Sequence, residues 1–456
     1  MNKLGIEASI RHVPELDPKY FPILRFNQAF LKTAKKPVTI AVERDRGQVA
    51  VCRTFIHGTD ERYEADCYYM DRLVKTLLWM KGGWKVYVAG DERVGTYLKE
   101  AYSLAGKRAF DADFMAGVYE KPFEVELCDQ VPEEKDVSQS IGRHMDGCRI
   151  GFDAGGSDRK VSAVVDGETV YSEEVVWHPK VTADPQYHYD GIVAAFKSAA
   201  EHMPRVDAVG VSSAGVYIND RTMVASLFLK VPKDQFDSKV KDIYIRAVKD
   251  TFGDIPYAVC NDGDVSALAG AMSLEDNSVL GIAMGTSEAV GYVDGDGNIC
   301  GWLNELAFAP VDGQPDAMED EWSGDIGCGV KYFSQDGVIK LAPRAGIELT
   351  GASPAEKLKE VQALMAADDA RAKAVYESIG VYLGHTLGLY AMFYDIRHVQ
   401  MMGRVMSGKG GDIIMETASR VMDEEYPDVA FRPEAPDEKT RRVGQSAAAA
   451  SLPELK

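Results

Sequence analysis

An asparagine–aspartate pair follows an apolar segment near the middle of the chain. Asn261 and Asp262 come directly after PYAVC, residues 256–260, which is typical of a buried strand. Polar residues at the carboxyl end of a strand commonly line a cleft in an open α/β sheet. An aspartate there can accept the proton of a hydroxyl group as it attacks a phosphoryl group. The alternative is a cap on the small-residue helix that follows, but Asp264 is the better candidate for that cap.

A glycine turn with a carboxylate and a hydroxyl ends an earlier apolar segment. Asp153 can hold Mg²⁺, usually through a water molecule. Gly155 and Gly156 allow the backbone to approach phosphate oxygens closely, and Ser157 adds a hydroxyl donor. A tight hairpin turn explains the same residues equally well. The segment matches neither a Walker A loop nor the Rossmann glycine pattern.

Two later loops repeat parts of this combination. Gly285, Thr286 and Ser287 end another apolar segment, and two such hairpins facing each other could cradle one phosphate chain. Glu288 follows directly, and its negative charge argues against a phosphate there. Gly403 lies where a predicted strand opens into a glycine-rich loop. Such a loop can contact an adenine ring, bind anions or be an ordinary connection.

These residues need a framework of alternating strands and amphipathic helices, and the chain shows that α/β pattern from residue 37 onward. The predicted strands are 38–43, 48–57, 84–91, 149–156, 160–167, 169–177, 206–213, 256–262, 278–287, 289–297 and 397–405, with further strands near 114–128. The predicted helices are 64–83, 92–106, 189–203, 238–253, 265–273, 410–422 and 437–452, with a long helical region over 354–394. The alanine run at 447–450 predicts a tightly packed helix face. Residues 1–36 show no clear period.

One order of elements occurs twice. Residues 38–90 and 149–215 both run strand, turn, strand, helix and strand, with one extra strand in the second segment. The first segment could be a degenerate copy of the second. Independent recurrence of a common α/β unit is the favoured explanation.

Composition excludes several classes of protein. The 456 residues are 46% hydrophobic, and the formal net charge of −20 disfavours binding to nucleic acid polymers and anionic membranes. Seven cysteines are widely spaced without a CxxC pair, which disfavours zinc ribbons and disulfide frameworks. No apolar run is long enough for a transmembrane helix, and the N-terminus does not resemble a signal peptide. We therefore expect a cytoplasmic protein.

Taken together, the segments resemble the ROK family of sugar kinases and repressors, within the actin/hexokinase/Hsp70 superfamily. RIGFDAGGSDRKVSAVVDG resembles the family's first phosphate loop, and VLGIAMGTSEAVGYVDGDG its second. PYAVCNDGDVSALAGA is similar to the catalytic segment and is the strongest match. VDAVGVSSAG resembles the interdomain strand, and VQMMGRV a depleted adenosine loop. The resemblance covers roughly residues 149–452.

The resemblance implies roles for individual residues. Asp262 would be the catalytic base, and the substrate would be bound by Asn261, Ser213 and Glu305. Asp153 would organise Mg²⁺. The residues that would hold ATP are Asp153, Gly155, Gly156, Ser157, Gly285, Thr286, Ser287 and Gly403.

The resemblance also implies a two-lobed actin-like ATPase fold, which is ribonuclease H-like, with an additional N-terminal α/β region. The expected domains are residues 1–145, of unknown role, then a first lobe over 148–265 and a second over 266–456 with C-terminal helices. The expected partners are a nucleotide and a small sugar-like substrate, and a homodimer is left open.

The sequence departs from the family at its zinc site. Phe308 stands at the position of the zinc-binding histidine, and Glu321 and Ser323 stand at two cysteine positions. Only Cys328 remains, and one thiolate cannot build a tetrahedral zinc site, so we expect no structural zinc. A sugar-contacting glutamate is replaced by Val330. These losses predict a substrate other than plain glucose in the family's usual pose.

Two other functions fit the same fold. A non-catalytic ligand sensor or pseudokinase is suggested by the depleted adenosine loop, by Glu288 and by the altered sugar pocket. An ATPase acting on another protein would use Asp262 to position water. Repression is disfavoured because residues 1–145 contain no basic recognition helix.

Overall fold

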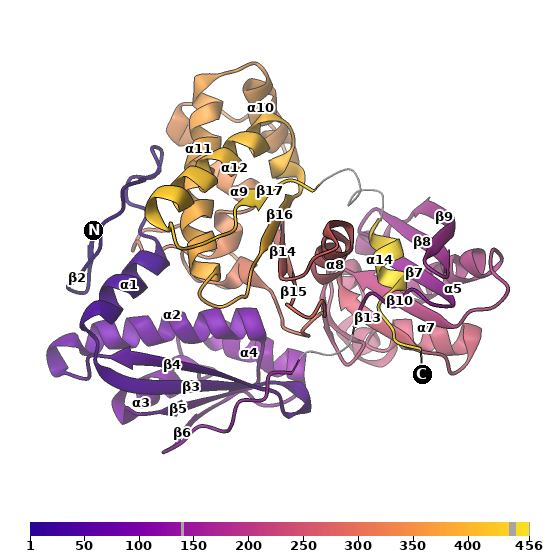
Figure 1. Ribbon diagram of the computed structural model, residues 1–456, viewed down its shortest axis with the longest axis horizontal. Coiled ribbons are helices and arrows are strands. Elements are labelled where there is room, and N and C mark those ends of the chain that lie inside the picture. Colours follow the sequence, from indigo (N-terminus) through magenta and orange to yellow (C-terminus); the bar gives the residue numbers. More distant parts are fainter. Residues whose placement is uncertain (138–140, 437–443, 456) are drawn as a thin grey trace. The chain divides into compact units, whose positions relative to one another are not determined.

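The computed structural model describes residues 1–137, 141–436 and 444–455. The chain forms two compact units, whose elements are labelled in Figure 1. Unit 1 comprises residues 1–137, 282–290 and 302–435, and unit 2 comprises residues 138–281, 291–301 and 436–456 as far as they are described. Within the described ranges, no helix is both long enough and apolar enough to span a bilayer.

Unit 2 is built on a five-stranded sheet with the order β13-β10-β7-β8-β9. β7 (Cys148–Ala154), β8 (Asp158–Val165) and β9 (Glu168–Val176) are antiparallel neighbours. β10 (Ala208–Ser213) pairs in parallel with both β7 and β13 (Tyr257–Asn261). The carboxyl ends of β7, β10 and β13 therefore lie at one edge of the sheet. The strand assignments from the sequence are confirmed here to within a few residues.

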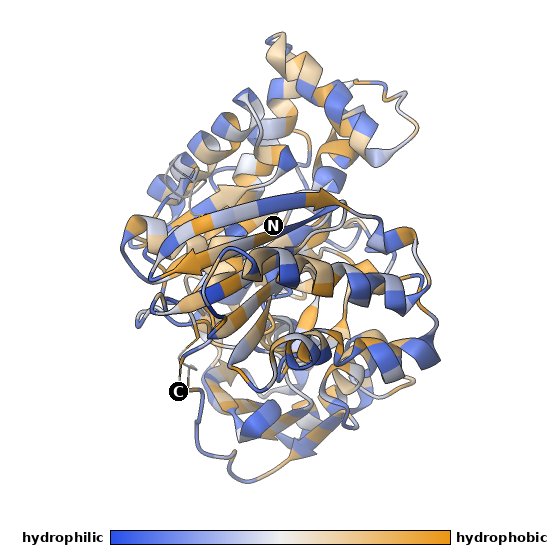
Figure 2. Ribbon diagram, turned by 90° about the vertical axis from the view of Figure 1, so that its right-hand side faces the viewer, coloured by the Kyte–Doolittle hydropathy of each residue, from blue (hydrophilic) through white to orange (hydrophobic). Residues whose placement is uncertain are grey.

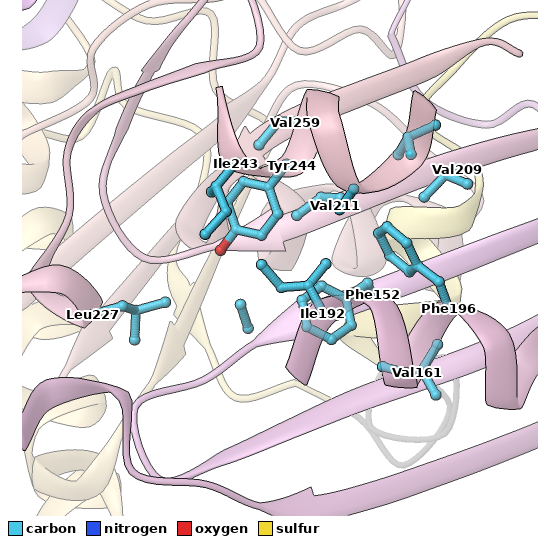
Figure 3. Packing of buried hydrophobic residues seen from close by; sticks show 14 of the residues in the cluster. Phe152, Val161, Ile192, Phe196, Val209, Val211, Leu227, Ile243, Tyr244 and Val259 are labelled. Carbon is cyan, nitrogen blue, oxygen red and sulfur yellow. The ribbon is translucent and has the colours of Figure 1, made fainter. Parts of the chain in front are cut away.

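One face of this sheet packs on α5 (Pro185–Ala200) and α7 (Ile243–Phe252). Figure 3 shows Phe152 and Val211 from the strands beside Ile192 and Phe196 of α5 and Tyr244 of α7. The rings of Phe152 and Phe196 meet edge to face with their centroids 5.6 Å apart. Because side chains alternate between the two faces of a strand, the residues next to these point to the opposite face.

That opposite face carries α8 (Asp262–Leu274) and the C-terminal helix α14 (Gln445–Ala450). A methyl group at Gly151 would lie 1.6 Å from the carbonyl oxygen of Ser446, and one at Gly210 would lie 1.7 Å from that of Ala449. The α14 backbone therefore rests directly on the sheet. Residues 447–450 are buried, which confirms the predicted tight helix face. The first part of the predicted helix, residues 437–443, lies outside the described residues.

The N-terminal part of unit 1 contains a four-stranded sheet with the order β4-β3-β5-β6. Its strands are β3 (Lys36–Glu43), β4 (Val49–Ile56), β5 (Lys85–Ala89) and β6 (Glu124–Leu127). Its helices are α1 (Ile23–Thr33), α2 (Tyr63–Lys81), α3 (Glu92–Ala101) and α4 (Ala109–Tyr119). The prediction of strands near 114–128 was wrong for α4, because that helix is apolar around most of its circumference and gave no helical period. α1 was also missed.

The two segments with the same order of elements form different sheets. β3 pairs with β5 in antiparallel orientation, whereas the corresponding pair β7 and β10 is parallel. A duplicated unit would keep its strand directions, so this difference favours independent recurrence.

The remaining sheet has the order β15-β14-β16-β17. Its strands are β14 (Val279–Met284), β15 (Glu288–Val293), β16 (His398–Met402) and β17 (Pro433–Glu434). The nearby helices are α9 (Gln335–Leu341), α10 (Pro354–Ala366), α11 (Ala370–Tyr390) and α12 (Lys409–Glu425). The predicted helical region 354–394 is therefore two helices, and the Asp369 side chain caps the second by accepting from the N–H of Arg371.

The remaining β-strands and α-helix of the described chain are short: β1 (Asn2–Lys3), β2 (Ile6–Glu7), the hairpin of β11 (Val216–Ile218) with β12 (Arg221–Val224), and α6 (Lys233–Gln235). Figure 2 shows hydrophobic and hydrophilic residues alternating along most helices and strands, as expected for elements with one face in a core.

The close approach of α14 predicts that Gly151→Ala destabilises the protein. The added methyl group would meet backbone, which cannot rotate away, so α14 must shift from the sheet. We expect a loss of about 1–3 kcal/mol, as for other overpacked cores. The midpoint of urea unfolding measures it.

Gly117→Ala is the matched control. Gly117 lies inside α4 with no atom within 4 Å of the added methyl group. Alanine is favoured over glycine in a helix by about 1 kcal/mol, so this variant should be unchanged or more stable. Wild-type stability of Gly151→Ala would contradict the packing described for α14.

Candidate functional site

Polar side chains converge at the carboxyl edge of the unit 2 sheet. In the strand register, Asp153 of β7 lies beside Ser212 of β10, and Ser213 lies beside Asn261 of β13. Asp262 follows as the first residue of α8. The predicted strand-end residues Asp153, Asn261 and Asp262 therefore do meet at one edge.

Asp153 is partly buried at this edge. Its Oδ1 accepts a hydrogen bond of 3.1 Å from the Ser212 hydroxyl, which itself accepts from Gln445 Nε2 at 3.0 Å. Burial and the nearby Asp262 carboxylate raise the pKa of Asp153 to about 6. A group of this kind is mostly ionised near neutral pH but takes up a proton more readily than an ordinary aspartate, and a bound cation would favour its charged form.

Asp262 is the second carboxylate of the site. Burial raises its pKa above the ordinary value, while the Gly263 N–H and the Lys180 ammonium oppose that shift. The Asp262 carbonyl oxygen accepts a hydrogen bond of 2.8 Å from Gln445 Nε2. Gln445 of α14 thus joins Ser212 to Asp262, a connection between distant segments that no local sequence pattern could reveal.

The cap of α8 differs from the prediction. Asn261, not Asp264, caps the helix: its Oδ1 accepts from the N–H of Gly263 at 2.7 Å, and its Nδ2 donates to the carbonyl of Gly215 at 2.7 Å. Asp264 already lies inside the helix, and its Oδ1 accepts from the N–H of Tyr292 at 3.2 Å. Asp262 is not the cap, and its Oδ1 accepts from the N–H of Gly263 at 3.0 Å.

The first glycine turn joins β7 to β8, so it is a tight hairpin. The Trp177 indole donates to the carbonyl of Gly155 at 2.8 Å, and the Ser157 hydroxyl donates to Asp158 Oδ2 at 2.9 Å. A methyl group at Gly156 would lie 2.7 Å from Nζ of Lys180. The Lys180 ammonium group therefore lies against the turn, and its charge lowers the pKa of Asp262. Lys180 was not predicted as a site residue because it is distant in sequence from every glycine motif.

Ser213 does not join this group. It is fully buried, and its hydroxyl shares a hydrogen bond of 2.9 Å with the Tyr244 hydroxyl on the α7 side of the sheet. Ser212, one residue earlier, points to the opposite face and reaches Asp153. Strand alternation decides which of the two serines lies in the site.

Unit 1 holds the other predicted residues. Thr286 and Ser287 are exposed at the turn between β14 and β15, and Gly285 donates its N–H to the carbonyl of Ser287 at 3.0 Å. Gly403 ends the adjacent strand β16 with a φ of +96°, and a methyl group there would lie 2.4 Å from the Met284 carbonyl oxygen. The hydroxyl turn and the Gly403 loop are therefore neighbours within this unit.

Glu288 points into the interior of unit 1. It is 3% exposed, and its carboxyl group lies beside the Tyr390 hydroxyl. Burial and the nearby Glu305 raise the pKa of Glu288 to about 8. The side chain is mostly uncharged at neutral pH, which removes the objection that its charge would repel a phosphate at Gly285–Ser287.

The four positions at which the sequence resemblance implies zinc ligands in ROK proteins have other contacts. The Phe308 ring lies 4.3 Å from that of Trp79, and Glu321 forms an ion pair with Lys331. The Ser323 hydroxyl donates to Asp320 at 2.6 Å. Burial raises the pKa of the Cys328 thiol to about 12, so this cysteine is a protonated core residue.

The state of Glu288 predicts an unusual dependence of stability on pH. An unfolded glutamate loses its proton near its ordinary pKa of 4.5, whereas folded Glu288 keeps it until about 8. Stability should therefore fall as pH rises between these values. Glu288→Gln removes this dependence on pH. The free energy of unfolding of the variant, relative to that of the wild type, should therefore increase between about pH 5 and pH 8.

Urea unfolding midpoints at these two pH values measure the gain. Glu348→Gln, which changes an exposed glutamate, is the control and should follow the wild type at both. A stability difference for Glu288→Gln that does not change with pH would contradict a buried, proton-holding Glu288.

No family model and no curated protein matches the chain. Among solved structures it is similar to a ROK hexokinase from Thermus thermophilus, with 18% sequence identity and a TM-score of 0.52 over 66% of this chain and 96% of that one. It is also similar to a ROK family transcriptional regulator described as a homologue of the E. coli Mlc protein, with 16% identity and a TM-score of 0.50 over 68% of this chain and 78% of that one. A ROK family glucokinase from Streptomyces griseus, solved with glucose and AMPPNP, has 21% identity and a TM-score of 0.47 over 67% of this chain and 98% of that one.

The first two similarities concern the fold. They confirm the prediction made from the motifs: the chain has the actin-like ATPase fold of ROK proteins, with an additional N-terminal α/β region.

Proposed function

We propose that the protein is an ATP-dependent phosphotransferase that acts on a hydroxyl group of a sugar or sugar derivative. The observation that carries the proposal is the convergence of Asp153, Ser212 and Asp262 at one sheet edge, next to a glycine turn with a lysine against it. Phosphoryl transfer requires a base for the attacking hydroxyl and donors for phosphate oxygens, and this edge offers both.

Asp262 is the proposed general base. Burial raises its pKa above that of an ordinary aspartate, so this carboxylate accepts a proton more readily, which suits a general base. Its place at the first position of α8 keeps the carboxylate near the positive end of the helix. The Asn261 side chain donates to the carbonyl of Gly215, and the Gln445 side chain donates to the carbonyl of Asp262. These two hydrogen bonds hold the backbone from which the Asp262 side chain extends.

The nucleotide would be held by both turns. ATP supplies the phosphoryl group, and Mg²⁺ neutralises charge on its oxygens when bound. Asp153 fits the cation, usually through water, because a divalent charge would relieve the repulsion that Asp262 exerts on it. Gly155, Gly156 and Ser157 fit the phosphates, together with Lys180.

The proposal requires that the residues of unit 1 bind the same ligands. Gly285, Thr286 and Ser287 would contact the phosphates and Gly403 the nucleoside. Glu305, with Asn261, would hydrogen-bond the substrate. Ser213 has no part in this, since its hydroxyl lies in the core, and Ser212, which is equally buried, would act only by holding Asp153.

A non-catalytic sensor of the same fold is the second candidate. Phe308 and Val330 replace two hydrogen-bonding residues of the family's sugar pocket, and one solved structure with this fold is a transcriptional regulator. Such a protein would bind nucleotide or sugar without turnover.

Asp262→Asn tests the base. We expect kcat to fall by about 10²–10⁴, the usual contribution of a general base, with binding of MgATP unchanged. ADP release over a panel of sugars measures turnover, and thermal shift with MgATP measures binding. Asp254→Asn, at an exposed position of unit 2, is the control and should remain active. Full activity of Asp262→Asn would remove Asp262 as the base, and a wild type that binds MgATP but turns over no sugar would favour the sensor.

Lys180→Ala tests the role of the ammonium group. We expect weaker binding of MgATP and a rise in the pH at which kcat/KM is half-maximal, because Lys180 holds the pKa of Asp262 down. Lys230→Ala removes an exposed lysine of unit 2 and should change neither quantity. An unchanged pH profile in Lys180→Ala would show that this lysine lies too far from Asp262 to act on it.

A further inference from the structure

The backbone carbonyls at the C-terminal end of α2 accept hydrogen bonds from a distant segment of the chain that begins at Asn304. The last carbonyls of a helix have no partner within it. Here the Leu78 carbonyl accepts from the N–H of Gly82 at 2.8 Å, as in an ordinary helix end. The next two accept from a distant segment: Trp79 from the N–H of Glu305 and Met80 from the N–H of Asn304, both at 2.9 Å. The backbone of Glu305 is therefore attached directly to a helix of the N-terminal region.

An aromatic contact lies beside these hydrogen bonds. Phe308 follows Glu305 by three residues, in a single 3-10 turn, and its ring lies 4.3 Å from that of Trp79. The Phe308 ring also lies 5.5 Å from that of Trp322. The Trp79 indole donates to Asp111 at 2.6 Å, which fixes the orientation of the ring. The segment after Glu305 thus packs on the same end of α2.

A buried ion cluster attaches the end of this segment to the middle of α2. Asp325 accepts from Arg72 at 3.0 Å, from Lys75 at 2.8 Å and from Arg108 at 2.7 Å. Lys75 is fully buried, and Arg72 and Arg108 are each 6% exposed. The other carboxylates of the cluster are Asp71, paired with both arginines, and Asp111, paired with Lys75. Although burial opposes it, the cations hold the pKa of Asp325 below its ordinary value.

The two attachments belong to one folded segment. Within residues 304–329, the N–H of Val311 donates to Gly327 at 2.9 Å, and that of Gly329 donates to Ala309 at 3.0 Å. The strand-like bridge between Pro310 and Cys328 closes the segment on itself. A shift of Asp325 relative to α2 would therefore be transmitted to Glu305.

We propose that α2 is a positioning element of the substrate site, and that the Asp325 cluster and the Trp79–Phe308 contact together set where Glu305 lies. This rests on the proposed function, in which Glu305 binds the substrate. The positions that align with the zinc ligands of ROK proteins, Phe308 and 321–328, lie within the attached segment. In this chain, contacts with the N-terminal region therefore hold the segment, which gives residues 1–137 a role in substrate binding.

Asp325→Asn tests the proposal in two measurements. The first is hydrogen exchange of a peptide containing residues 304–309. We expect exchange at least tenfold faster than in the wild type, because the carboxylate that links the segment to α2 is lost. The second is steady-state kinetics, in which KM for the sugar should rise at least tenfold while KM for ATP stays the same.

Tyr69→Phe is the matched control. Tyr69 lies on the same helix, but its hydroxyl bonds Thr54 of β4 at 2.6 Å and its ring stacks on Phe30 of α1. It should lose stability through the Thr54 hydrogen bond and change neither measurement. If Asp325→Asn does not fold, Phe308→Leu removes the aromatic contact without leaving a buried charge, and the same results are expected.

The outcomes separate this proposal from the proposed function. Faster exchange in a protein whose wild type phosphorylates no sugar would support the attachment and overturn the kinase. Unchanged exchange of residues 304–309 in both Asp325→Asn and Phe308→Leu would overturn the attachment of this segment to α2. Faster exchange with an unchanged KM for the sugar in an active enzyme would overturn the role of α2 in substrate binding.

Discussion

The candidate site depends on the repulsion between two carboxylates that the unit 2 sheet places at one edge. Asp153 ends β7 and Asp262 follows β13, and the charge of Asp262 contributes to the raised pKa of Asp153. Such an arrangement is unfavourable unless cations or donors offset it. Ser212, Gln445 and Lys180 come from three other segments and supply that compensation in part. A divalent cation with a phosphate chain would complete it.

Much of unit 2 and its site could be predicted from the sequence. Strand ends marked by Asp153 and Asn261 are local signals, and parallel pairing brings them together. The errors concern residues whose role depends on where one side chain points or on the residue at which a helix begins. Ser213 points into the core because side chains alternate along a strand, and Asn261 caps α8 because the cap precedes the first helical residue. The position of Lys180 beside the first glycine turn depends on tertiary contacts, which leave no pattern in the local sequence.

The N-terminal region shows a different limit of prediction. Its strands show a clear alternation of polar and apolar residues. The antiparallel direction of β5, however, depends on how the chain returns through α2, and the sequence does not determine that direction. α2 is apolar or buried along nearly its whole length, since it packs on the sheet and also holds the segment after Asn304. Its buried Arg72 and Lys75 pair with Asp71 and Asp111 and also with Asp325, which lies far along the chain and has no local sequence signal that links it to α2.

The seating of α14 on Gly151 and Gly210 has a consequence for synthesis on the ribosome. The strands of the unit 2 sheet leave the exit tunnel long before residues 445–450 do. Until then the groove over the two glycines is uncovered, and Ser212 and Asp262 lack the amide of Gln445. A nascent chain therefore has the acidic edge of the sheet before it has the Gln445 amide that bridges Ser212 and Asp262.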